Sequence, residues 1–412
     1  MRSNKTLNSI IMVILILSST FIVVSLGNVN ASQGEGYTYS TSENPSVATI
    51  TAYTGSGGSV TVPTTLGGHT VTSIGSNAFR SANAVTSVII PEGITSIGSS
   101  AFAYCGNLTS ITVPNSVKTI GNWAFSFCPS LTIIDVYSDN VNYSSVNGVL
   151  YNNNITTLIQ CPGAKTGPFD VPGTVTAIES EAFALCASIT SVTFPSGLAV
   201  IGDFAFANCY GLASLSIPSN VTSIGIAAFT HCTGLVSVDI PGSINNFGNG
   251  AFFQCSALTK VTIGNGLAVI SGSLFDYCTS LTDIVLPESV TTIGIGAFYQ
   301  CTSLTSITIP VNVTSLGNQT FQNCTSLRQI TFEGNAPSVG ADWATGCDSN
   351  LTILFQPKAT GFTTPRWKGI PTNPGNITGQ AANDKIWYYA LLAGIIFIVL
   401  ASVVLIARRK WN

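Results

Sequence analysis

Charge is the scarcest property of this chain: Asp, Glu, Lys and Arg make up 8% of its 412 residues, against about a quarter in an average protein. The formal net charge is −3, and we find no basic patch of the kind that nucleic-acid binding requires. Only two histidines occur, His69 and His231, and neither belongs to a catalytic motif. Nucleophile-elbow, metalloprotease and phosphate-loop motifs are missing too. We therefore predict a protein that is not an enzyme, holds no cofactor or metal, and does not bind nucleic acid.

Hydrophobic residues are abundant, at 45% of the chain, and many are β-branched, which favours strands over disorder. The apolar run "IIMVILILSSTFIVVSL" follows Arg2 and Lys5, and small residues precede Ser32. This order is typical of a secretory signal peptide, which we predict for residues 1–31. An uncleaved N-terminal anchor is the alternative, because the run is long for a signal peptide.

The C-terminal end carries a second apolar run, "IWYYALLAGIIFIVLASVVLIA", over residues 386–407. Its length suits a membrane-spanning helix. Aromatic residues begin it and Arg408, Arg409 and Lys410 follow it, which predicts a cytoplasmic tail at 408–412. The sequence thus predicts a single-pass cell-surface protein whose bulk lies outside the cell, with a flexible linker at 373–385. A processed sorting tail has a similar outline, although no Leu-Pro-x-Thr-Gly precedes this run.

Between these ends, the sequence repeats with a period of 23 residues. A phenylalanine, preceded by alanine in eight of ten units, marks the frame at Phe79, Phe102, Phe125, Phe183, Phe206, Phe229, Phe252, Phe275, Phe298 and Phe321. The step from Phe125 to Phe183 contains an enlarged unit, about residues 137–172. Within each unit, "L-x-x-I-x-I" alternates like a strand, whereas "A-F-x-x-C-x-x-L" has the spacing of one or two tight helical turns. Stacked units of this kind form a solenoid with a continuous core, and we predict an α+β repeat solenoid.

The recurring "VTSIGxxAFxxCxxLTSITIP" resembles the BspA-like, or Treponema pallidum-type, leucine-rich repeat. The resemblance covers about residues 37–372. It implies an N-terminal β cap at 32–66, a solenoid at 67–347, a hairpin in the enlarged unit, where "NNN" (152–154) suits a turn, and a C-terminal cap at 348–372. It also implies a role in adhesion or recognition.

Ten of the eleven cysteines occupy one column of the repeat. They are Cys105, Cys128, Cys186, Cys209, Cys232, Cys255, Cys278, Cys301, Cys324 and Cys347. Equivalent residues of stacked units lie about 4.8 Å apart, whereas a disulfide needs Cβ atoms at about 3.8 Å that lean together. We therefore interpret the column as small buried residues, with occasional disulfide pairing as the alternative. Cys161 lies outside the column.

The strand pattern predicts which side chains face outward on the concave side of the solenoid. The candidate binding residues are Ser110, Thr112, Asp135, Ser191, Thr193, Ser214, Ser216, Ser237, Asp239, Lys260, Thr262, Asp283, Ser306 and Thr308. Such residues are also ordinary solvent-facing strand residues. As a binding surface they would form a broad, weakly polar docking face.

Three functions follow from these observations. The resemblance favours adhesion or recognition of an extracellular protein or a cell-surface or glycan ligand, with a membrane anchor. A structural envelope protein that self-associates is one alternative. A glycan-binding surface built on the Ser/Thr rows is the other.

Overall fold

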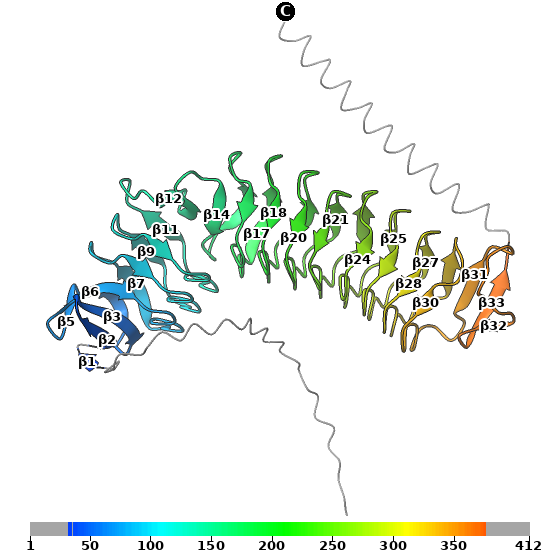
Figure 1. The fold of residues 1–412 in the computed structure, drawn as a ribbon, viewed down its shortest axis with the longest axis horizontal. Coiled ribbons are helices and arrows are strands. Elements are labelled where there is room, and N and C mark those ends of the chain that lie inside the picture. Colours follow the sequence, from blue (N-terminus) through cyan, green and yellow to red (C-terminus); the bar gives the residue numbers. More distant parts are fainter. Residues whose placement is uncertain (1–31, 35, 376–412) are drawn as a thin grey trace, which may run out of the picture.

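The computed structural model describes residues 32–34 and 36–375, and these residues form one curved stack of coils (Figure 1). The stack runs from the cap strands β1–β6 at one end to β32 and β33 at the other. Each regular coil contributes one longer strand and one two-residue strand, and each kind pairs in parallel with its equivalent in most neighbouring coils. The repeat frame is thus the frame of the coils.

The longer strands form what we call the long-strand sheets, in the orders β11-β9-β7-β4, β15-β17-β19-β21-β23-β25 and β27-β29-β31-β33-β32. Inward side chains of these strands are buried and the alternate ones face outward, as in β21, where Val238 and Ile240 are buried. The coil strands are β7 (Val85–Ile89), β9 (Ser110–Val113), β11 (Ile133–Val136), β15 (Thr166–Asp170), β17 (Ser188–Thr193), β19 (Ser214–Ser216), β21 (Ser237–Ile240), β23 (Lys260–Ile263), β25 (Asp283–Val285), β27 (Ser306–Ile309), β29 (Gln329–Phe332) and β31 (Thr352–Phe355).

The two-residue strands form a second set of parallel sheets. Their second residue is inward, as Ile224 of β20 is. They are β8 (Ser96–Ile97), β10 (Thr119–Ile120), β16 (Ala177–Ile178), β18 (Val200–Ile201), β20 (Ser223–Ile224), β22 (Asn246–Phe247), β24 (Val269–Ile270), β26 (Thr292–Ile293), β28 (Ser315–Leu316) and β30 (Ser338–Val339).

Both ends are closed by irregular strands. The N-terminal cap contains β1 (Ser32–Gly34), β2 (Tyr37–Glu43), β3 (Ser46–Tyr53), β4 (Gly58–Thr61), β5 (Thr65–Leu66) and β6 (His69–Ile74). The C-terminal hairpin contains β32 (Arg366–Trp367) and β33 (Ile370–Pro374). The start of the segment expected as a linker, Asn373 and Pro374, therefore lies in a strand.

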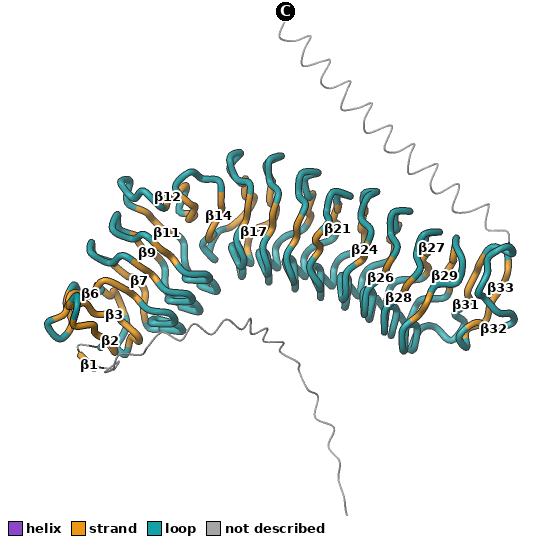
Figure 2. Tube along the Cα trace, viewed as in Figure 1, coloured by secondary structure: helices purple, strands orange, loops and turns teal. Residues whose placement is uncertain are grey.

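The third side of each coil, from three residues before the ladder phenylalanine to the column cysteine, is what we call the turn face. Our prediction of helical turns here is wrong: the described residues contain no helix (Figure 2), and the fold is a β-solenoid rather than α+β. In the coil of Phe229, the N–H groups of Ala227, Phe229 and His231 donate to carbonyls of the next coil at 2.8–3.0 Å. Those of Thr230 and Cys232 donate to carbonyls three residues back.

Two left-handed residues per coil explain why this segment does not become helical. Ala227 has φ 52° and His231 has φ 58°, and the equivalent positions of the other coils are left-handed as well. A helix would need right-handed angles throughout and N–H donors directed four residues back in the same coil. The inter-coil ladder uses those donors instead. The apolar spacing by three satisfies both geometries, so it did not distinguish them.

The localisation prediction also has to be corrected. In residues 32–34 and 36–375 there is no helix long and apolar enough to cross a membrane. The segments expected as signal peptide (1–31), membrane helix (386–407) and tail (408–412) lie outside the described residues, as does most of the linker. A single-pass membrane protein therefore forms no part of the function proposed below.

A ladder of phenylalanine rings runs through the core, one ring per coil. Successive rings are nearly parallel, with centroids 4.5 Å apart for Phe183 and Phe206 and 5.2 Å apart for Phe229 and Phe252. Tyr53 stacks on the first ring of the ladder at 4.9 Å and Trp343 meets the last one edge-on. Aromatic stacking along the axis thus joins the coils in two runs, Phe79 to Phe125 and Phe183 to Phe321, and is closed at the two ends of the solenoid.

The enlarged unit divides this core into two clusters. Its strands β12 (Tyr143–Val146), β13 (Val149–Asn152) and β14 (Thr157–Gln160) are antiparallel neighbours. Asn147 and Gly148, both with positive φ, make the first turn, and the "NNN" residues lead into the second. Leu150 of β13 packs into the N-terminal cluster, whereas Val149 and Tyr151 pack into the C-terminal one.

Candidate functional site

The outward side of the long-strand sheets, which we call the long-strand face, carries all fourteen candidate binding residues. Each of these side chains is either half-buried or exposed. Parallel register aligns them in two rows: Ser191 lies opposite Ser214, which lies opposite Ser237. Asp239 lies opposite Thr262 in the other row. The structure thus brings these candidate residues together on one surface.

Charges on the long-strand face are few and mostly negative. Asp135, Asp239 and Asp283 are exposed there, and Lys260 lies directly between Ser237 and Asp283 in register. The first long-strand sheet ends at β11 and the next begins at β15. The hairpin of the enlarged unit lies between them, because the N–H of Ile134 donates to the carbonyl of Gly148 at 2.9 Å. The face is thus interrupted at the enlarged unit.

The column cysteines lie inside the coils, behind the turn face. All eleven cysteines are free; Cys347 is half-buried and the others are buried. In nine of the ten column positions the thiol donates to the carbonyl of the ladder phenylalanine of the preceding coil, as Cys232 does to Phe206 at 3.2 Å. Cys186, which follows the enlarged unit, faces the carbonyl of Pro162 at 3.5 Å instead.

Burial raises the pKa of the Cys232 thiol to about 12 and that of Cys347 likewise. Thiols of this kind stay protonated at physiological pH and are poor nucleophiles and metal ligands. The column therefore has a physical role that the spacing alone did not reveal: each thiol adds an S–H donor between neighbouring coils. Among the described residues, no group of three or more His, Cys, Asp or Glu side chains is arranged to hold a metal ion.

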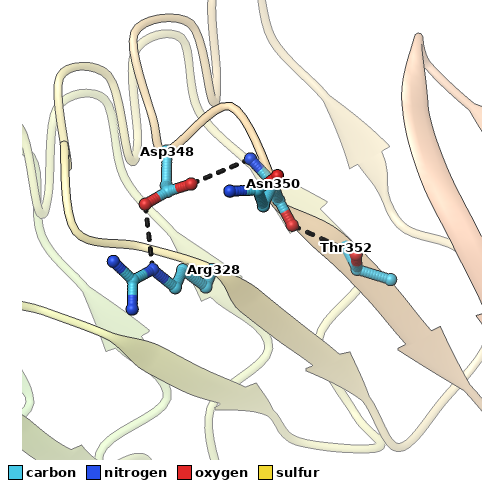
Figure 3. A network of polar contacts seen from close by, with 4 residues as sticks. All are labelled: Arg328, Asp348, Asn350 and Thr352. Atoms are coloured by element: carbon cyan, nitrogen blue, oxygen red, sulfur yellow. Dashed lines mark hydrogen bonds and ion pairs between the residues drawn. The ribbon is translucent and has the colours of Figure 1, made fainter.

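An ion pair stabilises the C-terminal coils. The Arg328 side chain donates to Asp348 at 2.9 Å, and the same carboxylate accepts the N–H of Asn350 at 2.8 Å (Figure 3). The Asn350 carbonyl accepts the Thr352 hydroxyl at 3.2 Å. The hydrogen bond from the Asn350 N–H and, to a smaller extent, the one from the Arg328 side chain lower the pKa of the Asp348 carboxyl. This network closes a turn between two coils and presents no reactive group.

The turn face holds a groove that the sequence reasoning missed. It has a volume of about 430 Å³ and runs across several coils, from Phe127 to Phe253. Phe204 forms a wall, and Ala227 and Gly250 lie at the same coil position as Phe204 and leave space beside it. His231 also lines the groove. Aligning the two residues after each ladder phenylalanine, rather than only the strands, would have shown this aromatic-rich surface.

The fold and these repeat positions define a leucine-rich repeat solenoid without a recognisable catalytic centre in the described residues. The model of the BspA-type leucine-rich repeat region (6 copies) matches residues 59–166, 163–282 and 268–365. Because these matches cover well over half of the chain, the protein belongs to the BspA-type leucine-rich repeat family.

Three solved structures are similar to it. A leucine-rich repeat protein from Eubacterium ventriosum is 26% identical, with 70% of this chain and 92% of that chain covered and a TM-score of 0.52. One from Bacteroides ovatus is 24% identical, covering 86% and 100%, with a TM-score of 0.51. A leucine-rich cell surface protein from Faecalibacterium prausnitzii is 27% identical, covering 75% and 96%, with a TM-score of 0.43. No curated protein matches the chain.

Proposed function

We propose that the protein acts in adhesion or recognition, docking a protein or surface ligand on the long-strand face. The observation that carries this proposal is the pair of in-register rows of short hydroxyl side chains along several consecutive strands. Membership of the BspA-type family supports a binding role rather than a catalytic one.

The chemistry of the long-strand face suits docking over a large area. Ser and Thr side chains are short, so they lose little conformational entropy on binding and leave the surface of the sheet accessible to a partner. The few charges, with Lys260 among aspartates, give a weak field that orients a partner rather than holding it tightly. Affinity would then come from area, or from many copies that bind together.

The test uses the full chain, immobilised and exposed to matrix proteins, glycans and whole cells. The triple variant Thr193→Lys, Ser216→Lys and Thr262→Lys places three long charged side chains on the rows, and we expect it to abolish saturable binding. Val269→Lys is the matched control, because Val269 is an exposed strand residue of the other sheet set. A matrix protein or a cell that binds the triple variant as well as the wild type would refute this site.

Self-association tests the structural alternative with the same variants. Sedimentation of the purified chain alone measures it. If the wild-type chain assembles with itself while the triple variant does not, and no member of the panel binds, the combined results favour a structural envelope role over recognition.

A further inference from the structure

The turn face from the coil of Phe229 to that of Phe298 carries one aromatic ring per coil outside the core. The centroids of His231 and Phe253 lie 5.7 Å apart, those of Phe253 and Tyr277 5.7 Å, and those of Tyr277 and Tyr299 5.6 Å. These rings are half-buried. They therefore form a continuous row along the solenoid axis, separate from the phenylalanine ladder inside and leading out of the groove beside Phe204.

Each of these coils also presents one polar side chain next to its ring. The two positions after the ladder phenylalanine hold Thr230 and His231 in one coil and Phe253 and Gln254 in the next. The pairs that follow are Asp276 with Tyr277 and Tyr299 with Gln300. The coil of Phe321, beyond the row, holds two polar residues at these positions, Gln322 and Asn323. The Tyr299 hydroxyl accepts from the amides of both Gln300 and Asn323. Each coil of the row thus presents one ring and one hydrogen-bonding side chain side by side, and this pair repeats from coil to coil along the solenoid axis.

Two buried acceptors beneath this surface lack a partner. In the described part of the chain, three buried side-chain oxygens make no hydrogen bond, and two of them are Asp276 Oδ1 and Gln322 Oε1. Both belong to the first position after the ladder phenylalanine. Buried acceptors are normally satisfied, but these two atoms lie beneath the row and out of contact with solvent. The polar groups that a hydroxyl-rich ligand on the row would meet are the half-buried side-chain amides of Gln254, Gln300 and Asn323.

Charge narrows the class of ligand. From the coil of Phe206 to that of Phe321 the turn face contains no Lys, Arg or Glu, and its only acidic residues are Asp203 and Asp276. An anionic polymer would find no cation there. Most backbone N–H groups of this face already donate to the neighbouring coil or locally, so an extended peptide would find few donors with which to pair as a further strand.

We propose that this aromatic row binds a neutral linear glycan laid along the solenoid axis, with one end in the groove between Phe204 and Phe253. Sugar rings have apolar faces that stack on aromatic side chains and hydroxyl edges that pair with amides and carboxyl oxygens. A chain of linked rings repeats on a scale comparable with the coil pitch. The site lies on a different side of the coil from the long-strand face and does not depend on the function proposed for that face.

Calorimetric titration of the full chain with three hexasaccharides tests this site: β-1,4-linked glucose, β-1,4-linked N-acetylglucosamine and the anionic galacturonate hexamer. We expect saturable binding of at least one neutral hexamer, and weaker binding of its disaccharide because fewer rings stack. The galacturonate hexamer should not bind. Absence of saturable binding by either neutral hexamer, or a preference for galacturonate, would overturn the proposal.

Two variants locate the site. Ala227→Trp fills the groove, and the fold tolerates it because Trp123 occupies the equivalent left-handed position of another coil. Tyr277→Ala removes one ring, whereas Tyr277→Phe keeps it. We expect Ala227→Trp and Tyr277→Ala each to weaken binding at least about tenfold, with Tyr277→Phe and the exposed control Val269→Ala close to wild type. Unchanged glycan binding by both Ala227→Trp and Tyr277→Ala would refute the assignment of the site. Melting curves of all variants verify that they fold.

Discussion

Replacement of Asp276 by asparagine isolates the energetic effect of one buried carboxyl group. Asp276 is 9% exposed, and its Oδ1 has no hydrogen-bond partner. Burial raises the pKa of this carboxyl from 3.8 to about 7, opposed in part by the Ser273 hydroxyl and the Tyr277 N–H. The folded protein therefore holds a proton that the unfolded chain releases at lower pH.

The sign of the pH dependence follows from this difference. Below the unfolded pKa of 3.8 the carboxyl is protonated in both states, and ionisation costs the fold nothing. As the pH rises towards 7, the unfolded state gains by ionising while the folded state cannot, so the fold loses stability. Above 7 the loss is complete, at up to about 4 kcal/mol, because a pKa difference of one corresponds to about 1.4 kcal/mol.

Urea unfolding of wild type and Asp276→Asn between pH 4 and pH 9 measures the effect as a difference. Asparagine has a similar shape and does not titrate. We expect the variant to gain stability relative to wild type as the pH rises from 4 to 7, and the gain to level off beyond. Glu181 also has a pKa raised by burial, but it is present in both proteins and cancels. A difference that does not change with pH would refute the reasoning.

Three further predictions concern the core and the cysteines. Phe252→Ala removes a fully buried ring between Phe229 and Phe275. It should lower the free energy of unfolding by about 3–5 kcal/mol. A urea midpoint equal to that of the exposed control Ile295→Ala would contradict a stabilising role of the stacked phenylalanine rings. Cys232→Ser places a hydroxyl on a shorter bond where the thiol reaches its carbonyl at 3.2 Å, so we expect a loss of about 1–3 kcal/mol and a lower melting temperature, and an unchanged melting curve would argue against the buried donor. Labelling of the unfolded, unreduced protein should modify all eleven cysteines, since all are free; low labelling would instead indicate disulfides.

The turn face shows where sequence reasoning failed. Ala228, Phe229 and Cys232 have a spacing that fits a tight helical turn, and the same spacing fits a segment with left-handed residues at Ala227 and His231. Only the neighbouring coil decides between them, because it supplies the carbonyls that accept alternate N–H groups. A single unit carries no information about its neighbour's hydrogen bonds.

The sequence by itself determined the coil frame, the identity of the inward and outward residues of the strands, and the family, because a repeat of fixed length forces equivalent residues into register. Tertiary structure decided that the third side is a non-helical ladder and that the enlarged unit separates two cores. It also brought Phe127 and Phe253, which lie far apart in the chain, into one groove. These features depend on how coils stack across the enlarged unit, and contacts of that kind are not encoded in the pattern of any one repeat.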